Sequence, residues 1–210
     1  MDPKFWHDRW RQNRIGFHRS DTNPLLIEYF SALELRRGQK VFLPLCGKTL
    51  DIRWLLLQGF QVAGVELSEL AIQQLFSELS ITPEVKKLGN LTLYRAKGLD
   101  IYVGDIFDLS YDLLGNVDAI YDRAALVALP EEMRAKYTSH LIEITDTAPQ
   151  LLITYEYDQT VIQGPPFSIS TKEVKEHYTD HYKVDHLIRL RVEGGMKGLT
   201  PATESVYLLK

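Results

Sequence analysis

An acidic residue and a glycine, spaced as in nucleotide-binding proteins, are the first residues here whose types and positions suggest chemistry. Glu66 follows Gly47 by about 20 residues, the separation at which an acid binds ribose hydroxyls in many α/β proteins. Residues 41–43 are β-prone, residues 51–57 carry apolar residues at helical spacing, and residues 61–65 return to strand character. This order predicts a strand, loop, helix and strand that hold a nucleoside. An α/β turn that binds no nucleotide is the alternative.

Two phosphate-binding motifs fail at this loop. A P-loop that ends in Gly47-Lys48-Thr49 would need a glycine at position 42, and that residue is Phe42. The three-glycine dinucleotide motif also fails, because Gly47 stands alone. With one glycine, a pyrophosphate lacks a second close approach to the backbone. The loop therefore favours an adenosine without a pyrophosphate, and S-adenosylmethionine (SAM) is the commonest such ligand.

Three further residues are candidates for contacts with a ligand. Asp105 follows an expected strand and could accept a hydrogen bond from an adenine amino group, with a helix N-cap as the alternative. Arg123 also follows a strand and could pair with a carboxylate, with a surface salt bridge as the alternative. Trp10 could stack on an adenine or cover a sulfonium, or could pack in the core.

The histidines and the single cysteine predict no metal site. His177 and His181 lie four residues apart on one helix, but no third ligand is evident. His18 has no metal-binding neighbour in the sequence, so we expect a surface or hydrogen-bonded histidine. Cys46 is expected to be a small packed residue rather than a reactive thiol.

The elements that would position these residues alternate between strands and helices. Asn23-Pro24, Ser68 and the capping box at residues 170–173 each mark the start of a helix. The loop at residues 158–168 contains two prolines and a phenylalanine, which indicates a stiff substrate wall or a stiff connector. The expected helices are 3–14, 24–33, 51–57, 68–83, 130–147 and one that begins at 170; the expected strands are 41–43, 61–65, 91–94, 99–103, 117–121, 151–155, 184–192 and 204–209.

The composition is that of one globular domain. The 210 residues are 45% hydrophobic and 25% charged, and the net charge of −4 argues against nucleic acid as the main partner. No apolar run approaches the ~18 residues that a membrane span needs. The charged, aromatic start of the chain is unlike a signal peptide, and one cysteine allows no internal disulfide. We therefore expect a cytoplasmic protein.

Several motifs, taken in order, resemble the thiopurine S-methyltransferase family in its bacterial form, nearly end to end. Each motif alone is weak, whereas the ordered set is specific. The motifs are Lys4-Phe5-Trp6 with Arg9-Trp10, Arg14-Ile15-Gly16-Phe17-His18, Pro44-Leu45-Cys46-Gly47-Lys48, Gly64-Val65-Glu66-Leu67-Ser68, Gly104-Asp105-Ile106-Phe107, Tyr121-Asp122-Arg123-Ala124-Ala125-Leu126-Val127-Ala128-Leu129-Pro130 and Val206-Tyr207-Leu208-Leu209.

The resemblance implies a class I SAM-dependent methyltransferase fold. This is an α/β, Rossmann-like fold with a mostly parallel seven-stranded sheet, an antiparallel last strand and helices on both faces. Residues 1–210 would form a single domain, in which residues 1–35 are an N-terminal helical cap over the cofactor site.

The resemblance also implies the site residues, and it implies no dedicated catalytic base. A second arginine near the substrate could be Arg189 or Arg191, in a region that matches the family poorly. By similarity, SAM would contact Trp10, Leu45, Glu66 and Arg123, with Asp105 and Ile106 beside the adenine; the substrate would contact Phe17, Arg123, Pro166 and Phe167.

The implied activity is methyl transfer from SAM to the sulfur of thiopurines or other small aromatic or heterocyclic thiols. A halide, thiol, selenium or tellurium methyltransferase on the same scaffold is the alternative. A nucleotide-binding oxidoreductase and a non-catalytic SAM-binding module are competing classes. The expected partner is a small-molecule thiol, with no nucleic acid, no membrane and no metal, and the expected state is a monomer.

Overall fold

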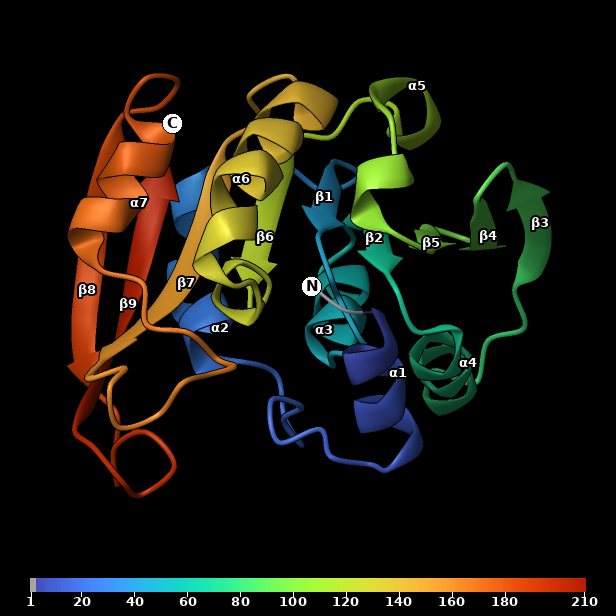
Figure 1. The fold of residues 1–210 in the computed structure, drawn as a ribbon. Helices are drawn as coiled ribbons and strands as arrows, with labels where there is room; N and C mark the ends of the chain where they lie inside the picture. Colours follow the sequence, from blue (N-terminus) through green and yellow to red (C-terminus); the bar gives the residue numbers. More distant parts are fainter. Residues whose placement is uncertain (1–2) are drawn as a thin grey trace.

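The computed structural model describes residues 3–210, which form one nine-stranded sheet with helices on both faces (Figure 1). The strands are β1 (Lys40–Leu43), β2 (Gln61–Glu66), β3 (Glu84–Leu88), β4 (Leu91–Ala96), β5 (Leu99–Val103), β6 (Ala119–Arg123), β7 (Gln150–Tyr157), β8 (Val184–Arg191) and β9 (Ala202–Leu209). The helices are α1 (Pro3–Arg11), α2 (Pro24–Tyr29), α3 (Asp51–Leu57), α4 (Glu69–Glu78), α5 (Tyr111–Leu114), α6 (Glu131–Thr145) and α7 (Thr171–Tyr178), with 3-10 turns η1 (Phe30–Leu33), η2 (Ile106–Asp108) and η3 (Leu126–Ala128).

The strand order is β3-β4-β5-β2-β1-β6-β7-β9-β8. Strands β5, β2, β1, β6 and β7 are parallel, so their carboxyl ends meet at one edge of the sheet. Strand β9 is antiparallel to both of its neighbours. The expected seven strands are therefore present, in the spatial order β5-β2-β1-β6-β7-β9-β8, and the last of them in the chain, β9, is the antiparallel one. The expected hairpin is β4–β5.

The strand count differs from the prediction because the sheet continues beyond β5. Strand β4 adds to β5, and β3 pairs with β4 at the edge of the sheet. The sequence of β3, Glu84-Val85-Lys86-Lys87-Leu88, is mostly exposed and charged. Such an edge strand has no buried face, so it lacks the alternating apolar pattern by which strands are predicted.

The core consists of two layers, one on each face of the sheet. Successive residues of β1 alternate between them, because side chains of a strand point to opposite faces. Phe42 packs with residues of α6 and α7, whereas Val41 and Leu43 pack with residues of α2, α3 and α4. All three side chains are buried, as the apolar sequence of this strand predicts.

The predicted helix starts are confirmed, whereas several predicted ends are too late. Asn23, Ser68 and Ser170 each accept a hydrogen bond from a backbone N–H of the helix that follows. Helix α1 ends at Arg11 rather than at residue 14. Helix α4 ends at Glu78 rather than at Pro83, because the backbone turns left-handed at Ser80 (φ +56°) before the proline is reached.

No helix within residues 3–210 has the length and apolar character that a transmembrane span requires.

Candidate active site

A cavity of about 490 Å³ lies at the carboxyl ends of the parallel strands, where open α/β sheets bind ligands. Helix α1 lies near the ends of β1 and β2 (Figure 1) and forms one side of the cavity together with residues 16–19. The loops after β1, β2, β5, β6 and β7 and the loop between β8 and β9 form the remaining walls. The volume is within the range of small-molecule sites.

Glu66, the last residue of β2, joins the two loops at the floor of this cavity. Its carboxylate accepts hydrogen bonds from the backbone N–H of Gly47 (2.9 Å) and of Ser68 (2.8 Å). Its side chain is buried, and burial raises its pKa, while the N–H donors of Ser68 and Gly47 oppose that rise. Each carboxylate oxygen keeps lone-pair capacity toward the cavity, so Glu66 can accept further hydrogen bonds from hydroxyl groups.

The loop between β1 and α3 has a backbone conformation that suits a close ligand contact. Leu45 (φ +45°) and Gly47 (φ +53°) both adopt left-handed conformations, and both line the cavity. A Cβ atom at Gly47 would lie 3.1 Å from the indole ring of Trp10. Glycine is therefore needed both for its φ and for the packing of α1 against this loop.

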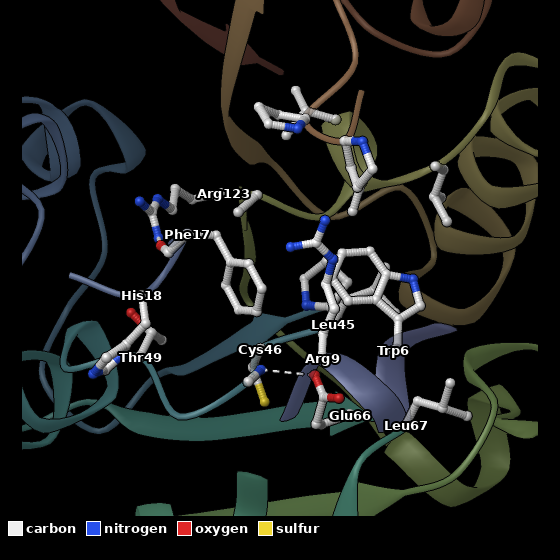
Figure 2. A pocket seen from close by; sticks show the side chains of 18 of the residues that line it. Trp6, Arg9, Phe17, His18, Leu45, Cys46, Thr49, Glu66, Leu67 and Arg123 are labelled. Carbon is white, nitrogen blue, oxygen red and sulfur yellow. Dashed lines mark hydrogen bonds between the residues drawn. The ribbon is translucent and has the colours of Figure 1, made fainter. Parts of the chain in front are cut away.

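Aromatic side chains of the N-terminal segment enclose the same space. Trp10 is 3% exposed, and its ring lies edge-on to that of Phe17, with centroids 5.6 Å apart. Trp6 also meets Phe17 edge-on, at 5.7 Å. Figure 2 shows Trp6 and Phe17 above the loop that contains Cys46. Trp10 thus packs in the core and lines the cavity, so its two predicted roles are compatible.

Asp105 and Ile106 line the cavity after β5. The Asp105 carboxylate accepts a hydrogen bond from the backbone N–H of Phe107 (3.0 Å), so it caps the turn η2, as one of the two predicted roles requires. Ile106 is buried and presents an apolar surface. This pair could contact the edge and the face of a base.

Arg123, the last residue of β6, forms no salt bridge within residues 3–210. One terminal nitrogen donates a hydrogen bond to the backbone oxygen of Phe17 (2.9 Å), which links β6 to the N-terminal segment. The Nε atom of Arg123 is buried and has no hydrogen-bond partner. The guanidinium therefore retains donors for a ligand in the cavity.

The predicted substrate wall is present only in part. Pro165 and Pro166 line the cavity, whereas Phe167 lies outside the lining. The Phe167 ring packs 5.4 Å from the guanidinium carbon of Arg134, and its backbone N–H donates to the carbonyl of Val127. Phe167 therefore packs behind the wall residues, on the side away from the cavity. The wall is completed by Lys197, whose ammonium donates to the carbonyl of Pro165 (3.1 Å).

Neither Arg189 nor Arg191 lines the cavity. Arg189 lies in the edge strand β8 and binds the Glu156 carboxylate (2.8 Å) and the Thr171 hydroxyl (3.0 Å). Arg9 of α1 lines the cavity instead, and Figure 2 shows it there beside Trp6. Arg9 belongs to the first motif of the resemblance, but nothing in the helical pattern distinguishes it from the exposed Arg11.

His18 and Cys46 also line the cavity, and both are expected to be neutral. Burial, followed by the nearby positive charge of Lys48, lowers the pKa of His18. Burial raises the pKa of the Cys46 thiol, so a thiolate is disfavoured there. Across residues 3–210, no three His, Cys, Asp or Glu side chains lie close enough together to hold a metal ion.

Two acidic residues and one arginine at the cavity lie at the ends of different strands of the sheet. Glu66 and Asp105 follow β2 and β5, whereas Arg123 ends β6 on the other side of β1. Glu66 and Asp105 can accept hydrogen bonds from a nucleoside, and Arg123 can donate hydrogen bonds to an anionic group. Such a cavity suits a reaction between two bound small molecules, because it can align them and exclude water.

Known proteins resemble this chain over its whole length. A family model described as thiopurine S-methyltransferase matches residues 1–210. Proteins named thiopurine S-methyltransferase from Xanthobacter autotrophicus and Teredinibacter turnerae are each 52% identical to this chain, over 100% of its length and 99% and 97% of theirs.

Solved structures share the fold at low identity. A SAM-dependent methyltransferase from Anabaena variabilis superimposes with a TM-score of 0.65 at 12% identity, over 99% of this chain and 95% of that one. The 1,6-didemethyltoxoflavin-N1-methyltransferase of Burkholderia thailandensis, solved with S-adenosylhomocysteine (SAH), gives 0.67 at 14%, over 99% and 87%. The sheet described above is thus that of the class I SAM-dependent methyltransferases.

Proposed function

Because the chain belongs to the thiopurine S-methyltransferase family, we propose that it transfers the methyl group of SAM to the sulfur of thiopurines or other small aromatic or heterocyclic thiols. The observation that carries this proposal is the Glu66 carboxylate, which is buried at the cavity floor and hydrogen-bonded to Gly47. Its position suits ribose hydroxyls, and the single glycine beside it suits a ligand without a pyrophosphate.

The cofactor side of the cavity fits SAM by the chemistry of its donors and acceptors. Glu66 would hold the ribose hydroxyls, and Asp105 and Ile106 would contact the adenine. Leu45 and Trp10 would enclose the remaining length of the molecule, where an aromatic ring can attract a sulfonium. These assignments agree with the side chains that line the cavity.

The residues of this chain would promote the reaction by alignment and by exclusion of water. When bound, SAM supplies a methyl group on a positively charged sulfur: a lone pair of the acceptor sulfur forms the new S–C bond, and the electrons of the broken bond stay on the departing SAH sulfur. Phe17, Pro166 and Arg123 would orient the acceptor. Such a displacement needs no covalent nucleophile and no dedicated base, provided that the acceptor is bound as a thiolate.

The cellular state of the protein is also part of the proposal. We propose a monomer, because both edge strands of the sheet carry charged residues that disfavour pairing with another chain. We also propose that it acts in the cytoplasm, since its single cysteine is buried and unpaired.

A methyl-acceptor assay with labelled SAM tests the activity. We expect the label to be transferred to 6-mercaptopurine and other heterocyclic thiols faster than to iodide, selenite or tellurite. Turnover of halide or of selenium and tellurium compounds without thiopurine turnover would favour the alternative. Tight SAM binding without transfer to any acceptor would indicate a non-catalytic module, and binding of NAD in place of SAM would reject the proposal.

A further inference from the structure

Arg9 lines the cavity but has no role in the proposed function as described so far. The Arg9 Nε atom is buried and has no hydrogen-bond partner. One terminal nitrogen donates to the backbone oxygen of Arg14 (3.1 Å), and the guanidinium carbon lies 4.9 Å from the centre of the Phe5 ring. These contacts fix the side chain on α1 while its remaining donors stay free for the cavity that it lines.

Arg9 and Arg123 have the same kind of unsatisfied hydrogen-bond donor. Both guanidinium groups line the cavity, and both have a buried Nε atom without a partner. Neither forms a salt bridge with any carboxylate of residues 3–210. Both residues are partly buried, and each keeps a buried N–H donor whose loss of water is costly unless a ligand accepts a hydrogen bond from it. Two such groups at one cavity therefore indicate an anionic ligand.

The other positive groups at the cavity are hydrogen-bonded to other residues, exposed to solvent or mostly neutral. Lys48 forms an ion pair with Glu78 (2.6 Å), and Lys197 donates to the carbonyl of Pro165. Arg19 is exposed to solvent. The pKa of His18 is lowered, so its imidazole is mostly neutral near pH 7.

Each acidic group at the cavity is held by hydrogen bonds from residues other than Arg9. Glu66 binds two backbone N–H groups, and Asp105 caps a turn. The buried Asp51 carboxylate accepts hydrogen bonds from the backbone N–H of Asn23 (2.8 Å) and from the hydroxyl of Tyr121 (3.1 Å). No acid at the cavity is therefore placed as a counter-ion for Arg9.

The charge balance points to the acceptor as the missing anion. The described part of the cavity is lined by five arginines and lysines and by three acidic residues, and the ion pair of Lys48 with Glu78 leaves an excess of one positive charge. SAM has one carboxylate but two positive groups, so its binding adds positive charge. A second bound molecule that is anionic would offset the excess. The acceptor of the proposed reaction is such a molecule once its thiol is ionised.

We propose that Arg9 is the second cationic residue of the acceptor site and that it binds, together with Arg123, the acceptor as a thiolate. This proposal rests on the proposed function and replaces Arg189 and Arg191 in the role expected for a second arginine. The thiol proton leaves to solvent on binding, and the two arginines hold the resulting charge. The sulfur lone pair then attacks the methyl group, which yields the neutral thioether and SAH.

The ionisation of the bound acceptor can be measured without turnover. The ultraviolet spectrum of 6-mercaptopurine differs between its neutral and anionic forms, so it can be titrated on the protein saturated with SAH. We expect the wild-type protein to favour the anion by about tenfold or more, as one close positive charge does. Arg9→Met should lose most of this preference, and Arg9→Lys should retain part of it.

Arg11→Met is the matched control. Arg11 lies on the same helix, its side chain is 64% exposed, and it pairs with Asp8 (3.0 Å) outside the cavity. Its substitution removes the same net charge, so its titration should match that of the wild-type protein. Circular dichroism of each variant establishes that α1 and the remaining fold are retained.

Two results would overturn the assignment of Arg9. In the first, Arg9→Met and the wild-type protein ionise the acceptor equally. In the second, Arg9→Met weakens the binding of SAH about tenfold in calorimetry and leaves the acceptor spectrum unchanged, which would assign Arg9 to the cofactor carboxylate. Failure of the proposed function is distinguishable, because the wild-type protein itself would then transfer no methyl group to any thiol.

Discussion

Glu66 is buried at the cavity floor and forms no ion pair within residues 3–210, and backbone donors hold its charge. The N–H groups of Gly47 and Ser68 belong to the two loops that follow β1 and β2. An acid placed in this way fixes both loops and still offers acceptor capacity to a ligand. Its loss should therefore affect both the binding of SAM and the stability of the loops.

We expect Glu66→Ala to weaken SAM binding by about 1–3 kcal/mol, because hydroxyl groups of the ligand and two backbone N–H groups lose their acceptor. Isothermal titration calorimetry measures the affinity. Glu143→Ala, at an exposed position of α6, is the control and should bind SAM as the wild-type protein does. Unchanged affinity in Glu66→Ala would reject the assignment of Glu66 to the ribose.

Asp122 is the neighbour of Arg123 in β6, but its side chain points into the core. It is fully buried and accepts hydrogen bonds from the hydroxyl of Tyr137 (2.7 Å) and from the backbone N–H of Leu126 (3.1 Å). Burial raises its pKa from 3.8 to about 6, against the effect of these hydrogen bonds. Asp122 thereby anchors η3, whose residues line the cavity.

The raised pKa of Asp122 predicts a pH-dependent stability. The folded protein binds this proton more tightly than the unfolded chain, so the contribution of Asp122 is fully present below about pH 4 and is lost as the pH rises to about 6. The loss is at most about 3 kcal/mol. Asp122→Asn removes this titration. Urea unfolding from pH 4 to 8 should show the wild-type protein losing stability relative to the variant, whereas parallel curves would contradict the prediction.

Helix α1 packs on the loop after β1 where the indole ring of Trp10 lies against Gly47. This contact is a property of the two elements together, since a Cβ atom at Gly47 would lie 3.1 Å from the indole and would require it to shift. Gly89, in the turn between β3 and β4, has nearly the same left-handed φ (+58° against +53°) but no atom within 4 Å of an added Cβ. Substituting each of these glycines therefore distinguishes the cost of the left-handed backbone from the cost of disturbed packing.

Both Gly47→Ala and Gly89→Ala should lose about 1–2 kcal/mol of folding stability from the left-handed backbone. Only Gly47→Ala should also displace Trp10, and we expect it to weaken SAH binding by about fivefold or more, or about 1 kcal/mol. Calorimetry and tryptophan fluorescence measure the two effects. If the two variants bind SAH equally well, α1 does not depend on this contact to cover the site.

The elements that the sequence predicted correctly are those with a local chemical signature. Asn23 and Ser68 were identifiable as caps because their side chains satisfy the first N–H groups of a helix. The exposed strand β3 has no such signature. Arg9 could not be separated from Arg11, because only the packing of α1 on the sheet decides which of the two faces the cavity.

At the scale of the whole molecule, the cavity connects parts of the chain that are far apart in sequence. Its walls include α1, the loops after five parallel strands, and Lys197 between β8 and β9. Residues of both core layers line the cavity at this edge of the sheet, so a bound ligand contacts both layers. A bound ligand should therefore stabilise the complete fold rather than one loop.

The thermal midpoint measures this stabilisation. A ligand at 100 times its dissociation constant adds about 2.7 kcal/mol, and each kcal/mol raises the midpoint by about 2–4 °C in a protein of this size, so SAH should raise it by about 5–11 °C. NAD at the same concentration should cause no shift, because the loop with Gly47 lacks the second and third glycines of a dinucleotide site. Glu66→Ala should respond to SAH only at higher concentration. A shift with NAD and none with SAH would contradict the assignment of this cavity to SAM.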